Sequence, residues 1–168
     1  MIGSPFEMPH DDNSPLDMME EAATAKGWTC SRSDEDFLVI KLPGQKTTYE
    51  VSMEWQEEFS ALLMSVAIPL EIGEAQYEIA TRTLEQINTN LWMGHFDLST
   101  KGYLPTFRQT LLFRMIPAGM GVDMVQDVLD IAVAECNRFY TTFQLVQAGD
   151  TRLNDNLSAA VFETVGEA

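Results

Sequence analysis

The sequence predicts an α+β protein in which helices cover one antiparallel sheet as a two-layer sandwich. Apolar and polar residues alternate within residues 28–68 and again within 91–115, a pattern typical of strands. Apolar residues recur every three or four positions before, between and after these regions, which is typical of helices. The strand segments are joined by short turns, which favours antiparallel pairing. The predicted order is therefore helix, β-meander, helix, β-hairpin and long helix.

The first helix is predicted to start after Ser14. Ser14 suits the N-cap, Pro15 suits the first helical position, and Asp17 lies at the positive end of the helix dipole. Gly27 offers a left-handed stop. Residues 1–13 hold glycine, prolines and an acidic pair, so they are predicted to be a disordered leader.

A meander of three or four antiparallel strands is predicted next. From Thr48 the alternation is regular, with the apolar side chains on one face: Tyr49, Val51, Met53 and Trp55. A polar turn at 56–58 separates this strand from another at 59–68, and shorter strands are expected at 28–32 and 37–40.

The second half of the chain returns to helical spacing after Pro69. A helix is predicted from Glu71, followed by a hairpin with arms at 91–97 and 103–115. The longest helix is expected at 121–147. The main domain is therefore predicted to span 14–149, and residues 150–168 are predicted to form a C-terminal helical tail.

Composition restricts the function. The chain has 168 residues, with 26 acidic and 10 basic side chains and a net charge of −16, which excludes a phosphate-binding surface and therefore nucleic acid as a partner. No apolar stretch is long enough to span a membrane, and the N-terminus shows no targeting signal. We therefore expect a cytoplasmic protein that has no membrane partner and keeps its thiols reduced.

No cofactor, metal or catalytic site is predicted. The two histidines and two cysteines lack metal-ligand spacing, and no nucleophile motif is present. Cys136 falls on the apolar face of the long helix and is expected to be a small buried hydrophobe.

Two side chains in the hairpin stand out. His95 is expected to face Arg108 across the two arms, which is consistent with an ordinary polar sheet face or with a face that recognises an acidic or polar peptide. Together with four further residues they form the predicted interaction surface: His95, Arg108, Tyr103, Leu153, Leu157 and Val161.

Residues 88–114 hold an Asn-rich helix exit, a Gly-x-Phe-x-Leu strand, a Gly-containing turn and an aromatic-Arg-x-x-Leu strand, here represented by Gly94, Phe96, Leu98, Gly102, Phe107, Arg108 and Leu111. With these motifs the segment resembles the YbjN-like family of bacterial proteins. In element order the resemblance extends over about 15–147. It implies a regulator of sensory transduction with a fold similar to type III secretion chaperones, which are acidic, usually dimeric and bind extended client segments.

We therefore expect a non-enzymatic protein-interaction module, a regulator or chaperone-like binder of a client protein or peptide segment. A homodimer is expected, because an apolar tail stripe and a long strand both need a covering surface. Two alternatives stay open: a small-ligand sensor with a pocket between sheet and helices, and a small hydrolase that uses His95.

Overall fold

The computed structural model describes residues 14–116, 120–150 and 152–153. The predicted order of elements is confirmed, with bounds as follows: α1 (Pro15–Ala25), β1 (Thr29–Asp34), β2 (Phe37–Pro43), β3 (Thr48–Gln56), the 3-10 helix η1 (Glu57–Phe59), β4 (Ala61–Ala67), the 3-10 helix η2 (Glu74–Gln76), α2 (Tyr77–Thr89), β5 (His95–Leu98), β6 (Pro105–Leu112) and α3 (Gly121–Gln147). The predicted leader and most of the predicted tail lie outside the described residues.

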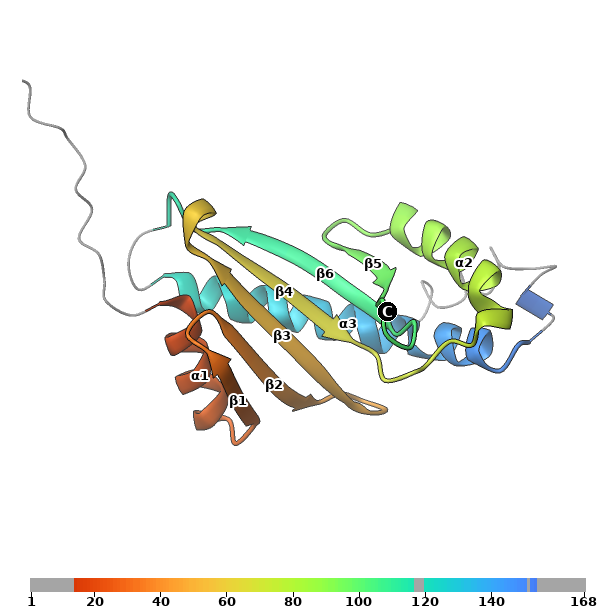
Figure 1. The fold of residues 1–168 in the computed structure, drawn as a ribbon, viewed down its shortest axis with the longest axis horizontal. Coiled ribbons are helices and arrows are strands. Elements are labelled where there is room, and N and C mark those ends of the chain that lie inside the picture. The colour runs from red at the N-terminus through yellow and green to blue at the C-terminus, as the bar shows by residue number, and fades with distance from the viewer. Residues whose placement is uncertain (1–13, 117–119, 151, 154–168) are drawn as a thin grey trace, which may run out of the picture.

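The strands form one antiparallel sheet in the order β1-β2-β3-β4-β6-β5 (Figure 1). Strands β1 to β4 pair in sequence as a meander. Strand β6 then pairs with β4, and β5 lies outside β6 at the edge. The two strands that end the sheet are therefore β1 and β5.

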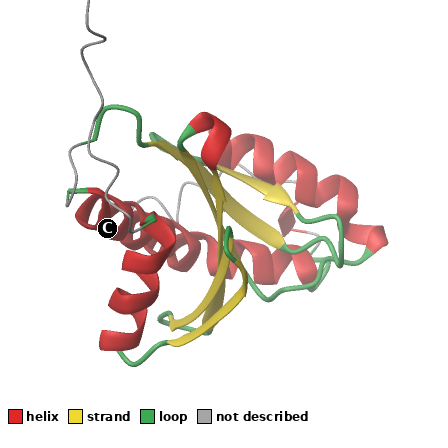
Figure 2. Ribbon diagram, turned by 60° about the vertical axis from the view of Figure 1, so that its left-hand side comes forward, coloured by secondary structure: helices red, strands yellow, loops and turns green. Residues whose placement is uncertain are grey.

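The described helices leave one face of this sheet open. Helix α3 lies behind β4 and β6 in the view of Figure 1, and α1 packs against β1, β2 and β3. Helix α2 packs against β5 and α3. Figure 2 shows α1 and the beginning of α3 on one side of the strands. The predicted two-layer α+β architecture is confirmed.

An aromatic group fills the core where β5 and β6 meet α3. The Phe96 ring lies 5.4 Å from that of Phe107, 6.0 Å from that of Phe139 and 5.5 Å from that of Phe143. All four side chains are 2% exposed or less. Tilted and edge-on pairs of this kind stabilise beyond the area they bury. They fix the end of the sheet that carries β5.

Helix α1 begins as the sequence predicts. The Asp17 amide donates to the Ser14 hydroxyl, and the Ser14 amide donates to the Asp17 carboxylate, which completes a capping box. Arg32 of β1 then contacts Asp17 at 2.9 Å and Glu20 at 3.3 Å. These ion pairs connect the helix to the edge of the sheet.

Three predicted boundaries are wrong. The helix expected from Glu71 starts only at Tyr77, because Ile72 is buried in an extended segment whose amide donates to the Gly102 carbonyl at 3.3 Å. The first hairpin arm begins at His95 rather than at 91, because Gly94 has a φ of +66°. The second arm spans only 105–112, because Tyr103 takes a left-handed φ of +47° before Pro105.

Candidate functional site

The open face of the sheet presents uncharged side chains along its central strand. In β4 the residues facing the helices are buried, namely Leu62, Met64 and Val66. Because side chains alternate along a strand, the remaining β4 residues face the open side: Ala61, Leu63, Ser65 and Ala67. The last three are half-buried although no described helix lies over them. The middle of the face is therefore small, uncharged and accessible.

A polar cluster lies beside this strip. Register places Ser65 opposite Arg108 and Arg108 opposite His95, so that the three form one row across β4, β6 and β5. The Arg108 guanidinium donates to Asp97 Oδ2 at 2.6 Å and to Ser65 Oγ at 3.0 Å. The Arg108 and Asp97 side chains are 42% and 41% exposed. The cluster thus holds a cation in place at the surface.

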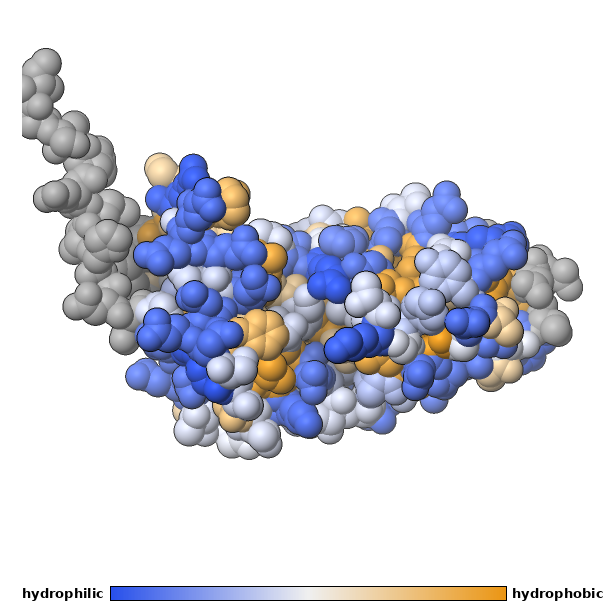
Figure 3. Space-filling view, in the orientation of Figure 1, coloured by the Kyte–Doolittle hydropathy of each residue, from blue (hydrophilic) through white to orange (hydrophobic). Residues whose placement is uncertain are grey.

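Charges on the other half of the face are mostly acidic. Glu50 and Glu54 of β3 are exposed and lie opposite Ala67 and Leu63 of β4. Lys41 of β2 lies opposite Glu50. The uncharged strip is therefore bordered by carboxylates on the β3 side and by the Arg108 cluster on the β6 side (Figure 3 shows this face).

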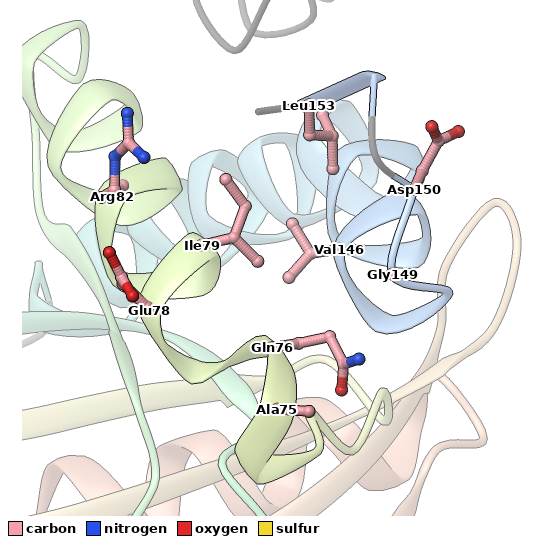
Figure 4. Close-up of a pocket in the computed structure, with 9 residues that line it drawn as sticks. All are labelled: Ala75, Gln76, Glu78, Ile79, Arg82, Val146, Gly149, Asp150 and Leu153. Atoms are coloured by element: carbon pink, nitrogen blue, oxygen red, sulfur yellow. The ribbon is translucent and has the colours of Figure 1, made fainter. Parts of the chain in front are cut away.

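A separate pocket of about 240 Å³ lies between α2 and the end of α3. Figure 4 shows Ile79, Val146 and Leu153 pointing toward one another at its centre. Arg82 and Asp150 also line this pocket, whereas His95 does not. The pocket is formed by helices, so it differs from the sheet–helix pocket that the ligand-sensor hypothesis expects and from the His95 cleft that the hydrolase hypothesis expects.

Neither thiol is activated as a nucleophile. Burial raises the pKa of the Cys136 thiol, which is fully buried in α3. Burial, followed by the negative charge of Glu20, raises the pKa of the Cys30 thiol. In the described parts of the chain, no group of three or more His, Cys, Asp or Glu side chains is placed to hold a metal ion.

Comparison with known proteins identifies the family. A family model described as "Putative bacterial sensory transduction regulator" matches residues 15–145. The chain belongs to the YbjN family. No curated protein sequence matches it. None of the helices in the described ranges combines the length and apolar character needed to cross a membrane.

Solved structures show the same fold at low sequence identity. YbjN from E. coli, described as "a putative transcription regulator", matches with a TM-score of 0.53 and 11% identity over 76% of this chain and 92% of that chain. The ExsC-ExsE complex matches with a TM-score of 0.51 and 14% identity over 79% of this chain and 94% of the matched chain. The predicted relation to the YbjN family is thus confirmed, and the fold matches both of these solved structures.

The residues that carry the YbjN resemblance serve the fold. Phe96 and Phe107 are core side chains, and Gly94 lies so close to the Phe107 ring that an added Cβ would overlap it. Gly102 takes a φ of +72° in the turn before β6. These motifs therefore specify the β5–β6 hairpin, and Arg108 is the motif residue that faces the open side.

The structure brings together part of the predicted interaction surface. His95 and Arg108 are cross-strand neighbours, as predicted. Tyr103 lies in the turn before β6, where its ring is 5.1 Å from that of Tyr77. Leu153 is 2% exposed in the core on the helix side, so it does not share a surface with His95. Leu157 and Val161 lie outside the described residues.

Sequence reasoning missed Ser65 as a partner of Arg108. A polar side chain in an apolar strand was visible as a signal, but its partner lies 43 positions further along the chain. Only the pairing of β4 with β6 joins them. Helix α2 and strand β5 lie between β4 and β6 in the chain, so no short turn joins the two strands and the sequence does not indicate that they pair.

Proposed function

We propose that this YbjN-family chain is a non-enzymatic regulator or chaperone-like protein that binds a segment of a client protein on the open face of its sheet. One observation carries the proposal. The central strand β4 presents Leu63, Ser65 and Ala67 on a face that no described helix covers. An antiparallel sheet can leave one face in solvent, but the centre of this face carries no charged side chain, so an extended client segment can pack along it.

The chemistry of the face supports a peptide rather than a small substrate. It is broad and has a fixed cation at Arg108, held by Asp97 and Ser65. A client segment lying along β4 would place apolar side chains on Leu63 and an acceptor group near Arg108. The pocket between α2 and α3 lies away from His95, so it does not support the hydrolase alternative.

The comparisons support this proposal at the level of fold and family. The family is described as a regulator, and the ExsC-ExsE structure is, by its name, a complex. We extend client binding to this chain on that basis, together with the expected homodimer and a cytoplasmic location. The acidic net charge of −16 is consistent with such a protein.

The test introduces a charge on the open face. Tagged protein purified from its own host, with the associated proteins identified by mass spectrometry, is compared with Leu63→Arg. Ala134→Arg is the matched control, because Ala134 is exposed on α3 on the other side of the sheet. We expect Leu63→Arg to lose the client that the wild type and Ala134→Arg retain, with an unchanged circular dichroism spectrum.

Two outcomes contradict the proposal. Retention of the same client in equal amount by Leu63→Arg would move the binding site away from the open face. Recovery of no protein above the amount bound by an unrelated acidic protein of similar size would contradict client binding itself.

A further inference from the structure

Several large apolar side chains are exposed on segments that meet at one end of the molecule. Four of them are Phe59, Leu112, Met115 and Met120, which are 51%, 65%, 90% and 61% exposed. We call these four residues the apolar end patch. Figure 3 shows apolar residues projecting among polar ones at the upper left, where η1 and the end of β6 lie in Figure 1. Single exposed apolar residues are normal, but a group of them marks an interaction site.

Phe113 holds the segments of the patch together. Its ring packs edge-on against Trp55 at a centroid distance of 5.5 Å. Its backbone amide donates at 2.8 Å to the carbonyl of Ser60, the residue that directly follows Phe59. Gly121, which follows Met120, lies so close that an added Cβ would be 2.8 Å from the Phe113 ring. The patch residues therefore lie on three segments, and all three segments contact or contain Phe113.

Carboxylates surround this end. The β1–β2 turn is joined to β3 there, because the Trp55 amide donates to the Asp36 carbonyl at 2.8 Å. Exposed acidic residues follow on each segment near the patch: Asp34, Glu35, Asp36, Glu54, Glu57, Glu58 and Asp123. Of the basic residues in these segments, Arg32 is paired with Asp17 and Glu20, which leaves Arg114. The rim of the patch is negative.

We infer that the apolar end patch binds a basic amphipathic helix of a partner protein. This inference goes beyond the proposed function, because it assigns a second binding surface that is separate from the β4 strip. An amphipathic helix presents an apolar stripe to the patch and carries Lys and Arg beside that stripe, facing the acidic rim. Met115 and Met120 are flexible and polarisable, which suits contact with varied apolar stripes.

Charge disfavours the other occupants. A second copy meeting this end through a two-fold axis would bring two acidic rims together. The chain's own residues 1–13 contribute Glu7, Asp11 and Asp12 and no Lys or Arg. A basic partner is the occupant that the surrounding carboxylates attract.

The test uses methionine methyl groups as local probes in the full-length chain. The protein is labelled with ¹³C at the methionine methyls and titrated with a synthetic amphipathic helix of Leu and Lys, and separately with the same helix carrying Glu in place of Lys. We expect the Met115 and Met120 signals to shift with the Lys peptide alone, while those of the core residues Met53 and Met64 stay in place. Added salt should weaken binding.

Substitutions test whether the peptide binds at the patch or binds non-specifically to other exposed apolar residues. The double variant Leu112→Glu, Met115→Glu should lose at least about tenfold in affinity for the Lys peptide. Trp92→Glu is the control, since Trp92 is 72% exposed in the loop between α2 and β5. We expect this control to bind like the wild type.

Three results would overturn the inference. The first is equal affinity of the wild type for the Lys and Glu peptides, or equal affinity of the double variant and the Trp92→Glu control for the Lys peptide. The second is a Met115 shift that follows protein concentration without peptide, which would identify a second copy as the occupant. The third is a shift of the Met115 methyl signal when residues 2–13 are deleted, which would identify the N-terminal segment as the occupant of the patch. Each leaves the Leu63→Arg client experiment unaffected, so the two proposals fail separately.

Discussion

The side-chain amide of Asn88 hydrogen-bonds both backbone groups of Phe96. The Phe96 amide donates to Asn88 Oδ1 at 2.7 Å, and Asn88 Nδ2 donates to the Phe96 carbonyl at 2.9 Å. Because β5 lies at the edge of the sheet, these bonds replace those of a neighbouring strand. The end of α2 thus closes the edge at Phe96, and the opposite edge, β1, has no described strand beside it.

Asn88→Ala should lower the free energy of unfolding by about 1–3 kcal/mol, because two backbone groups beside a buried side chain lose their partner. Urea denaturation followed by circular dichroism measures this. Asn90→Ala is the control, since Asn90 is exposed and its side-chain Nδ2 donates to the Gln86 carbonyl within the same helix end. Equal losses in the two variants would show that the Phe96 bonds contribute nothing specific.

Gly94→Ala should destabilise the fold far more than Gly27→Ala. Both glycines have a left-handed φ, +66° and +72°, so each substitution should cost roughly 1–2 kcal/mol of backbone strain. At Gly27 an added Cβ meets nothing within 4 Å, whereas at Gly94 it overlaps the Phe107 ring and lies 2.8 Å from the Arg108 carbonyl. This overpacking should add roughly 1–3 kcal/mol. Thermal unfolding of both variants gives the difference, and similar melting temperatures would contradict the close approach.

Alkylation should distinguish the two thiols. A raised pKa means less thiolate at a given pH, so Cys30 should react with iodoacetamide more slowly than free cysteine near pH ~8.5. Glu20→Gln removes a negative charge that raises this pKa and should speed the reaction. Cys136 should react only on unfolding, because it is fully buried. Mass spectrometry of the modified peptides follows both, and rapid labelling of Cys136 in the folded protein would contradict its burial.

A homodimer is expected in solution. Light scattering at tens of micromolar should give about twice 18.9 kDa, and a mass near 18.9 kDa would reject it. Each chain carries a net charge of −16, so salt should strengthen association by screening the repulsion. Weakening by salt would instead indicate that ion pairs hold the interface.

The sequence predicts elements wherever one face is buried along the whole segment. In β3 the alternation from Thr48 matches a strand whose Tyr49, Val51 and Met53 side chains are all fully buried. At Glu71 the apolar spacing fits a helix as well as an extended segment. The hydrogen bond from Ile72 to Gly102 selects the extended form, and no local pattern reports this contact.

The apolar end patch was hidden from sequence reasoning for a similar reason. Met115 continues the alternation of Phe107 and Leu111, which places it on the same face of a strand that runs to 115 as predicted. The strand ends at Leu112, and Met115 lies 90% exposed beyond it. The cross-strand neighbours His95 and Arg108 were predictable because a short hairpin fixes their register.

The position of α3 in the chain has a consequence for synthesis. Strands β1 to β6 are complete at Leu112, but the helix that covers β4 and β6 extends to Gln147 and emerges from the ribosome after all of them. Until then the nascent sheet exposes apolar residues such as Met64, Val66 and Phe107, which are fully or almost fully buried in the finished protein. The nascent chain therefore passes through an aggregation-prone stage that ends only when α3 docks.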